Sequence, residues 1–177
     1  MTAAAPPMQG AIAFTDIVGF TEYTALRGDQ EALALLALQE RLVEKALPPG
    51  ARVVKELGDG LLLWFSDAAT AVNTLLDLQA IFEDEAERNE LPLWVRMGLH
   101  WGAPAQRRGD LIGHDVNLAS RIVNVAAPGE VVVSEAAKRA AEGAARGVVF
   151  EELGPVILKG IPAPVPLFRA ARFGYVG

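Results

Sequence analysis

Residues 53–65, VVKELGDGLLLWF, constrain the fold of this chain more than any other stretch. Two apolar runs flank a short polar segment in which Gly58 and Gly60 surround Asp59, a pattern typical of a tight turn between two antiparallel strands. A turn accounts for one glycine and for the aspartate. It does not account for Lys55 near the end of the incoming strand, so the hairpin is a candidate functional element.

Segments with strand or helix periodicity surround the hairpin. Residues 10–17 form a predicted strand. Leucines at helical spacing predict a helix over residues 29–47, and Pro-Pro-Gly at 48–50 ends it. Residues 67–89 form a second predicted amphipathic helix, with Asp67 in its first turn.

The second half of the chain alternates strands and helices. We predict strands over 93–102, 129–134, 148–153, 155–160 and 164–172, and helices over 114–126 and 135–144. The resulting order, β α ββ α β and then α β α β β, fits an α+β fold (an α/β sandwich) in which helices cover a mostly antiparallel sheet. No repeat or long linker divides the chain, so we expect one domain over residues 10–172, between a flexible lead at 1–9 and a tail at 173–177.

Composition limits the metal chemistry that is available. The 177 residues include no cysteine, which excludes disulfides and thiolate metal sites. Two histidines leave little room for a zinc site: we expect His100 to be packed within a strand, and His114 lies near a helix start without an assigned role. Any metal should therefore be hard and bound by oxygen.

Charge and hydropathy limit the partners. The formal net charge of −6 argues against a nucleic-acid surface. No apolar run approaches the roughly 20 residues that span a bilayer. The first residues lack the charged-then-apolar pattern of a signal peptide. We therefore expect a cytoplasmic protein.

Asp16 ends the first predicted strand and is followed by Ile-Val-Gly-Phe-Thr at residues 17–21. That segment can turn toward a helix and offer backbone N–H groups to a phosphate. Alternatively, Asp16 only caps the following turn. Asp59 at the hairpin turn favours the first interpretation, because two carboxylates at adjacent strand ends suit Mg²⁺ ions that also bind phosphate oxygens.

A third polar group lies in GDLIGHDVNLASRI, residues 109–122. Asn117 and Arg121 are four residues apart, so they share one face of the predicted helix. Such a pair suits a ribose or a polyphosphate, although the spacing alone is more simply that of an exposed surface pair. Asp110, taken alone, is compatible with an ordinary loop carboxylate.

Four motifs in this order resemble the catalytic domain of class III adenylate and guanylate cyclases, of the bacterial adenylate cyclase type. They are FTDIVGFT at 14–21, KELGDG at 55–60, VRMGLHWG at 95–102 and GHDVNLASR at 113–121. The LKG and VPLFR segments within 158–169 also resemble that family. The resemblance implies a ferredoxin-like βαββαβ core with additional C-terminal strands and helices, and a site that lies between two chains.

The resemblance also implies a role for each matching position. The implied metal-binding residues, for two Mg²⁺ or Mn²⁺ ions, are Asp16, Ile17 and Asp59. The implied substrate-binding residues are Lys55 and Asp110 on the purine, Gly19, Phe20 and Thr21 in the turn after the first strand, and Lys159 on the terminal phosphates. The implied transition-state pair is Asn117 on the ribose and Arg121 on the α-phosphate.

The implied activity is that of an adenylate cyclase, which converts ATP to 3′,5′-cyclic AMP and pyrophosphate in a homodimer whose active sites are shared between chains. Adenine offers an acceptor at N1 and a donor at N6, which matches the donor Lys55 and the acceptor Asp110. Guanine presents the reverse pattern, so this pair speaks against a guanylate or mixed-specificity cyclase. A catalytically silent nucleotide-binding dimerisation module would fit better if a site residue were missing. A polymerase-like nucleotidyl transferase is opposed by the negative charge.

Overall fold

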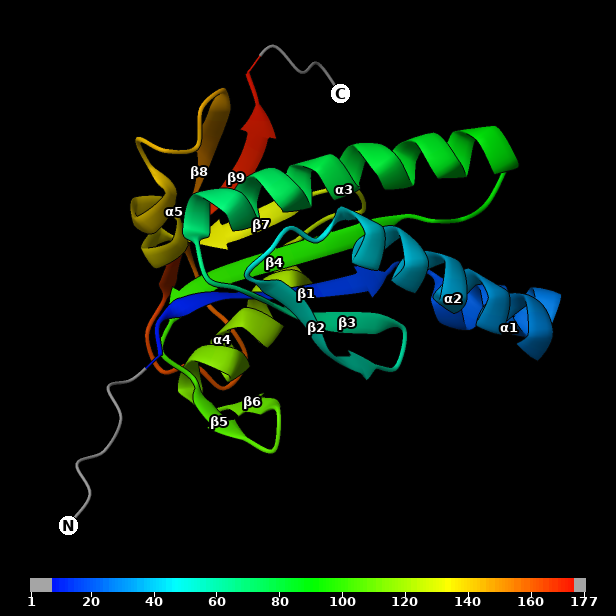
Figure 1. Cartoon of the computed structure of the whole chain (residues 1–177), viewed down its shortest axis with the longest axis horizontal. Helices are drawn as coiled ribbons and strands as arrows, with labels where there is room; N and C mark the ends of the chain where they lie inside the picture. The colour runs from blue at the N-terminus through cyan, green and yellow to red at the C-terminus, as the bar shows by residue number, and fades with distance from the viewer. Residues whose placement is uncertain (1–7, 174–177) are drawn as a thin grey trace.

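The computed structural model describes residues 8–173 and has the expected mixed α+β architecture (Figure 1). The strands are β1 Gly10–Ile17, β2 Ala51–Leu57, β3 Gly60–Phe65, β4 Val95–Gly102, β5 Ala105–Arg107, β6 Asp110–Ile112, β7 Val131–Ser134, β8 Val148–Val156 and β9 Val165–Arg172. The helices are α1 Phe20–Arg27, α2 Asp29–Ala46, α3 Ala68–Asn89, α4 His114–Ile122 and α5 Glu135–Ala141, with a 3-10 turn, η1, at Val123–Val125.

The main sheet has seven strands in the order β2-β3-β1-β4-β7-β9-β8. Within it, β1 pairs antiparallel with both β3 and β4, and β2 pairs antiparallel with β3, which is the arrangement expected of a ferredoxin-like βαββαβ core. β4 and β7 pair in parallel, and β9 and β8 continue the sheet in antiparallel fashion. The predicted fold class is confirmed.

The two faces of the sheet bury different sets of side chains, because neighbouring residues of a strand point to opposite faces. On β1, Ala11 and Ala13 belong to the large core beneath α2, α3 and α5. Ile12 and Phe14 belong to a second core that includes residues of α4 and β6. Figure 1 shows α3 and α4 on opposite sides of the sheet.

The two glycines of the β2–β3 hairpin serve different purposes. Gly58 lies in the turn with φ +60, a left-handed conformation that glycine adopts without strain. Gly60 lies opposite Asp16 in the β1–β3 pairing, and a Cβ atom there would lie 1.9 Å from the carbonyl oxygen of Thr15. The first glycine therefore permits the turn, and the second permits close approach of two strands.

Two elements were not predicted from the sequence. Helix α1 buries none of its residues completely, so it lacks the apolar stripe by which a helix is recognised. The β5–β6 hairpin consists of two three-residue strands, which are too short for a clear alternation.

Several predicted boundaries were wrong. A single strand, β8, extends through Gly154 to Val156 where two strands, 148–153 and 155–160, were expected. The pairing of β8 with β9 shifts register between Glu152 and Gly154, so Leu153 is an extra residue and the strand continues through a bulge rather than breaking. The helix expected to reach residue 126 ends at Ile122 and continues as a 3-10 turn.

The expected lead and tail fall largely beyond the described residues. Positions 1–7 and 174–177 lie outside residues 8–173, and the proposed domain limits therefore stay predictions. Within the described residues, no helix combines the length and apolar character needed to cross a bilayer.

Candidate functional site

The ends of β1 and of the β2–β3 hairpin bring Asp16 and Asp59 together. Asp16 lies opposite Gly60 in the antiparallel pairing of β1 with β3, and Asp59 is the neighbour of that glycine. Burial raises the pKa of Asp59 to about 6, with further contributions from a hydrogen bond to Asp16 and from the charge of Asp16. The two carboxyl groups therefore compete for protons and cations at one place.

Arg96 is a site residue that the sequence reasoning did not identify. It lies opposite Asp16 in the pairing of β1 with β4, and its Nε and Nη2 atoms donate to Asp16 Oδ2 at 2.8 and 2.7 Å. The same guanidinium donates to the backbone oxygen of Asn124, just after α4, at 3.3 Å. An arginine within a mostly apolar strand was the only signal in the sequence, and its partner is 80 residues away.

A buried polar pair supports the backbone around both aspartates. Thr15 and Gln39 are 3% and 1% exposed, and Thr15 Oγ1 donates to Gln39 Oε1 at 3.2 Å. Gln39 Nε2 donates to the backbone oxygen of Asp59 at 3.4 Å, and the N–H of Leu61 donates to Thr15 Oγ1 at 3.0 Å. Helix α2 is therefore connected to the strand before Asp16 and to the turn that carries Asp59.

The donor set fits hard divalent cations. The side chain of Ile17 is buried at 2% exposure, so this residue could contribute only its backbone oxygen. Among residues 8–173 no group of three or more His, Cys, Asp or Glu side chains could enclose a metal by itself. Two neighbouring carboxylates that repel each other match the way Mg²⁺ is held by one or two carboxylates and substrate phosphates.

The turn after β1 exposes backbone N–H groups. Gly19, at φ +76, is the N-cap of α1 and provides no side-chain cap, and the helix begins with Phe20 and Thr21. The first N–H groups of a helix lack partners within the helix. This turn lies directly after the strand that carries Asp16, so the three predicted substrate-binding positions adjoin the carboxyl pair.

The two predicted purine-binding residues form an ion pair within one chain. Lys55 Nζ on β2 lies 2.9 Å from Asp110 Oδ2 on β6. The hydrogen bond from Lys55, followed by that from the N–H of Leu111, lowers the pKa of Asp110. Arg52 Nη2 donates to the backbone oxygen of Gly109 at 3.1 Å, so the β5–β6 hairpin is held against β2 at a second point.

Helix α4 presents Asn117 and Arg121 away from its buried face. The buried residues of this helix are Val116, Leu118, Ala119 and Ile122. Asn117 is exposed and Arg121 is half-buried, and within residues 8–173 neither side chain forms a hydrogen bond or ion pair. Lys159 is exposed in the turn after β8. None of these three side chains forms a hydrogen bond or ion pair with the carboxyl pair or with the Lys55–Asp110 pair, so the described part of one chain holds the predicted residues as separate groups.

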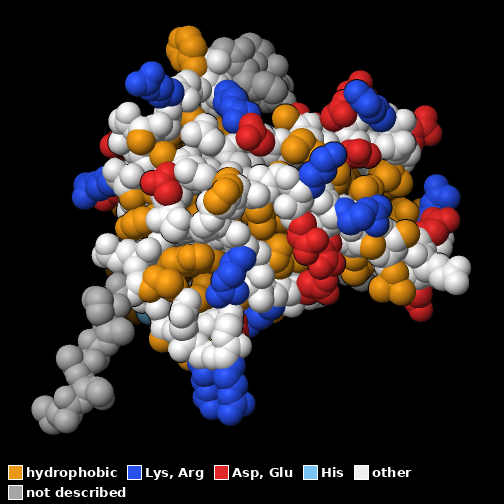
Figure 2. All heavy atoms as spheres, in the orientation of Figure 1, with side chains coloured by type: hydrophobic (Ala, Val, Ile, Leu, Met, Phe, Trp, Pro, Cys, Tyr) orange, Lys and Arg blue, Asp and Glu red, His pale blue; other side chains and the backbone are white. Residues whose placement is uncertain are grey.

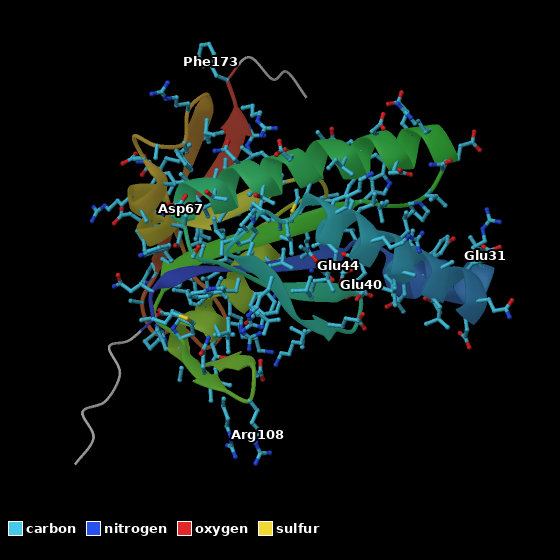
Figure 3. The ribbon with its side chains drawn as sticks, viewed as in Figure 1. Glu31, Glu40, Glu44, Asp67, Arg108 and Phe173 are labelled. Carbon is cyan, nitrogen blue, oxygen red and sulfur yellow. The ribbon has the colours of Figure 1, made fainter. Side chains whose placement is uncertain are left out.

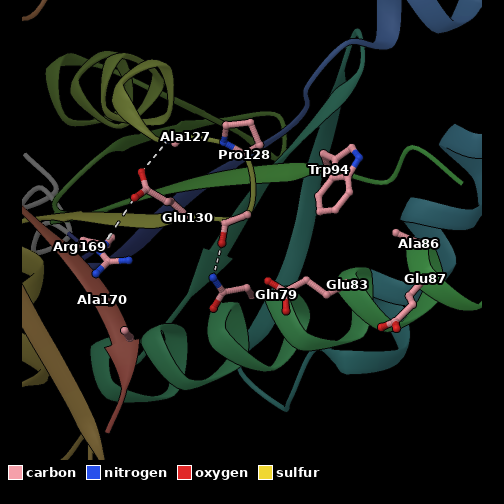
Figure 4. Close-up of a pocket in the computed structure, with 12 residues that line it drawn as sticks. Gln79, Glu83, Ala86, Glu87, Trp94, Ala127, Pro128, Glu130, Arg169 and Ala170 are labelled. Carbon is pink, nitrogen blue, oxygen red and sulfur yellow. Dashed lines mark hydrogen bonds and ion pairs between the residues drawn. The ribbon is translucent and has the colours of Figure 1, made fainter. Parts of the chain in front are cut away.

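A large cavity of the described chain lies away from the candidate site. A cavity of about 920 Å³ lies between α3, the loop 127–130 and β9 (Figure 4). Within it, Glu130 accepts from the N–H of Ala127 and lies 3.9 Å from Arg169. None of the predicted site residues lines this cavity.

The charges near the site are unevenly distributed. Figure 2 shows acidic side chains gathered in one patch, and Figure 3 shows Glu40 and Glu44 there on α2. A hydrogen bond with Glu56, then burial and the charges of Glu56 and Glu44, raise the pKa of Glu40. Arg108 lies at the tip of the β5–β6 hairpin and points away from the sheet (Figure 3).

Sequence comparison gives a consistent set of relatives. The family model of the adenylate and guanylate cyclase catalytic domain matches residues 4–169. A pH-sensitive adenylate cyclase, MT1302, of Mycobacterium tuberculosis is 34% identical over 176 residues, which cover 96% of this chain and 43% of that protein. An adenylate cyclase of Streptomyces coelicolor is 35% identical over 127 residues, which cover 71% and 32%. The chain spans less than half the length of these relatives.

Solved structures agree in fold. An adenylate cyclase from Trypanosoma brucei in its monomeric state superposes with a TM-score of 0.80 at 25% identity, over 95% of this chain and 91% of that one. The adenylyl cyclase CyaB from P. aeruginosa superposes with a TM-score of 0.81 at 22% identity, over 92% and 93%. The fold, the carboxyl pair at the strand ends and the family match lead to one conclusion: this chain belongs to the adenylate and guanylate cyclase catalytic-domain family.

Proposed function

We propose that this chain is an adenylate cyclase that converts ATP to 3′,5′-cyclic AMP and pyrophosphate, with two divalent cations and a second copy of the chain. The observation that carries the proposal is the juxtaposition of Asp16 and Asp59 at adjacent strand ends, where the pKa of Asp59 is raised to about 6. Two ionised carboxylates at such a place are stabilised by a divalent cation. The names of the relatives, with 34 to 35% identity, support the choice of activity.

The first group of residues would bind the divalent cations. Asp16, Asp59 and the backbone of Ile17 would hold Mg²⁺ or Mn²⁺, which when bound makes a hydroxyl more acidic and neutralises phosphate charge. The ribose 3′-oxygen forms a bond to the α-phosphorus as the bond from that phosphorus to the β-phosphate oxygen breaks. Pyrophosphate leaves and the 3′-hydroxyl proton passes to solvent.

The chain's own side chains bind and orient the nucleotide. Asn117 holds the ribose, and Arg121 donates to the oxygens of the α-phosphoryl group, where negative charge increases in the transition state. Lys159 and the turn from Gly19 to Thr21 bind phosphates. Neither Asn117 nor Arg121 has a partner among residues 8–173, so both side chains are available for these contacts.

The preference for ATP rests on Lys55 and Asp110. Lys55 Nζ and Asp110 Oδ2 form an ion pair at 2.9 Å, which holds both side chains where β2 meets β6. Adenine N1 accepts from an ammonium group and adenine N6 donates to a carboxylate, so the base can enter between them without leaving either unpaired. Guanine would face each with the wrong partner, which costs about 1–3 kcal/mol per unpaired group.

The shared homodimer site rests on the separation of the predicted groups. The carboxyl pair and the transition-state pair do not contact each other within the described chain, and the site has no enclosing wall. A two-fold partner would bring the Asn117 and Arg121 of one chain to the aspartates of the other, twice per dimer. A nucleic-acid template is disfavoured by the acidic cluster of Glu40, Glu44 and Glu56 near the site.

Incubation of the purified chain with ATP or GTP and Mn²⁺, followed by chromatography, tests the proposal. Cyclic AMP and pyrophosphate are the expected products, with ATP used at least about ten times more efficiently than GTP. Cyclic GMP as the main product would contradict the ATP assignment. Absence of both cyclic nucleotides would favour the catalytically silent module.

A further inference from the structure

Asp115, in the first turn of α4, connects the helix to the sheet rather than capping it. The N-cap of α4 is Gly113, and no side chain caps this helix. Asp115 Oδ2 accepts from the N–H of Ala103 at 2.9 Å, and its Oδ1 lies 3.0 Å from His100 Nε2. Both oxygens of the carboxylate therefore bind groups on β4 or directly after it. We propose that Asp115 is a positioning residue, which sets the place of Asn117 and Arg121 for the proposed cyclase reaction.

The contact continues through the sheet to the opposite helix layer. His100 is 7% exposed, and its Nδ1 lies 2.7 Å from Ser134 Oγ at the end of β7. The same Oγ accepts from the N–H of Ala137 in α5 at 3.1 Å. The hydroxyl proton of Ser134 has an acceptor if Nδ1 is unprotonated, which leaves the proton of neutral His100 on Nε2, where it is donated to Asp115. The chain of contacts thus runs from α5 through β7 and β4 to α4.

Two glycines on β4 allow both ends of α4 to approach the sheet closely. A Cβ on Gly102 would lie 2.3 Å from Asp115 Oδ2. A Cβ on Gly98 would lie 2.5 Å from the backbone nitrogen of Val123, just after the helix. Between these points the buried side chains of α4 make apolar contacts, which do not depend strongly on direction. The two hydrogen bonds of Asp115 are directional, so they determine how the helix is placed along and around its axis.

The placement of the helix matters for the reaction. Asn117 is two residues beyond Asp115, and Arg121 lies one turn further along the same helix. A displacement of about 1 Å in a positioning group can lower a rate about a hundredfold. Loss of Asp115 should therefore reduce the rate of turnover more than the affinity for nucleotide, because Lys55 and Asp110 lie on β2 and β6.

Few charged groups act on this network. Those that affect His100 are Asp115 and the exposed His114, both on α4. Ile12 on β1, opposite His100, is apolar, and β7 contributes Ser134. Burial lowers the pKa of His100, although Asp115 raises it in part. Burial alone would raise the pKa of Asp115, but hydrogen bonds from Ala103 and His100 lower it overall. Near neutral pH the pair is thus an uncharged imidazole with an ionised carboxylate.

Kinetics of three variants test the role. Asp115→Ala removes both acceptors, and we expect kcat to fall at least about tenfold with KM for the nucleotide within about twofold of wild type. Asp115→Asn keeps one acceptor oxygen and should lose less. His114→Gln is the matched control on the same helix turn, because His114 is exposed and makes no hydrogen bond in the network; its kcat should equal that of wild type. Rates are expressed per folded molecule, from circular dichroism.

NMR supplies a readout that does not depend on activity. The chain has two histidines, so the ¹⁵N signals of His100 and His114 are easily separated. We expect His100 to be the Nε2–H tautomer at neutral pH, with its pKa lowered by burial. An Nδ1–H tautomer would overturn the proposed chain of contacts.

The outcomes separate this inference from the proposed function on which it rests. A wild-type chain that makes no cyclic nucleotide overturns the proposed function and this role together. Normal wild-type turnover with an unchanged kcat in Asp115→Asn and Asp115→Ala overturns the positioning role alone. If Asp115→Ala fails to fold, Asp115→Asn decides: a lowered kcat at unchanged KM supports the role, and wild-type kinetics contradict it.

Discussion

The carboxyl groups of Asp16 and Asp59 destabilise each other when both are ionised. The pKa of Asp59 is raised from 3.8 to about 6, through burial and through Asp16. A carboxyl group with a raised folded-state pKa stabilises the fold fully below its unfolded pKa, and this contribution is lost as the pH rises through about 6. At neutral pH without a bound cation, the ionised carboxyl pair therefore lowers the free energy of unfolding. A divalent ion bound between the two groups would remove this repulsion.

Asp59→Asn should make the protein more stable and inactive. Above pH 6 the neutral side chain removes the repulsion, and we expect the free energy of unfolding to rise by about 1 kcal/mol, after allowance for solvent screening. Cyclic AMP formation should fall below detection with saturating Mn²⁺. Thermal melts at pH 5 and pH 7.5, with and without Mn²⁺, check the stability and the metal binding: Mn²⁺ should raise the Tm of the wild type only. Turnover near the wild-type rate would contradict the two-metal assignment.

Lys55→Glu combined with Asp110→Cys should change the base preference. The substitution reverses the donor and acceptor pattern that faces the purine, so ATP turnover should fall and relative GTP turnover should rise. We expect the ratio of kcat/KM for ATP over GTP to drop at least about tenfold. Competition assays with both nucleotides measure the ratio. An unchanged ratio would show that these residues do not read the base.

Among the elements, the β2–β3 hairpin shows how strand packing restricts sequence. Its turn glycine and its strand glycine look equivalent in the sequence, but a Cβ added at Gly58 would meet nothing within 4 Å, whereas a Cβ added at Gly60 would meet the backbone of β1. The close approach at Gly60 places Asp16 beside the turn that carries Asp59. The spacing of the carboxyl pair thus depends on a missing side chain.

Alanine at the two glycines should therefore have unequal effects. Gly58→Ala faces the left-handed backbone penalty of about 1 kcal/mol, since φ is +60 and the surrounding space is open. Gly60→Ala has to move two strands apart, and we expect a loss of at least about 3 kcal/mol. Urea unfolding curves of both variants measure the difference. Equal losses would mean that β1 and β3 do not approach as closely as described.

At the scale of the whole molecule, the described chain holds the predicted site residues as separate groups. The carboxyl pair and Lys55 lie on the main sheet and Asp110 lies on β6, but the side chains of Asn117 and Arg121 on α4 form no hydrogen bond or ion pair with any of them. A solvent-exposed surface gives little electrostatic stabilisation to a transition state, because water screens the charges. Assembly of two chains would exclude water and complete the constellation.

Two inactive variants should restore activity when they are combined. Asp16→Ala and Asn117→Ala homodimers each lack one component at every site. In a mixed dimer one site receives both substitutions and the other receives none. Random exchange makes about half of the dimers mixed, so roughly a quarter of the wild-type activity should return. Cyclic AMP formation is measured for each variant alone and after co-expression. Mixed dimers without recovery would place the whole site within one chain.

Much of the fold could be predicted from local patterns. The helix over 29–47 was confirmed as α2, because leucine spacing and a Pro-Pro-Gly stop depend on neighbours along the chain. The hairpin at 53–65 was confirmed for the same kind of reason. Helix α1 and the short β5–β6 arm were missed, since a helix without a buried face and three-residue strands leave no periodic signal.

For the site, the residue types in the motifs were enough to propose the chemistry, although the assigned roles stay predictions. The contacts between these residues could not be predicted from the sequence. Arg96 reaches Asp16 across 80 residues, Lys55 reaches Asp110 across 55, and His100 reaches Ser134 across 34. Such pairs depend on which strands are neighbours and in what register, which local sequence does not encode. The backbone approaches at Gly60 and Gly102 likewise arise only when the sheet is assembled and α4 is packed against it, because the atoms that would clash come from distant parts of the chain.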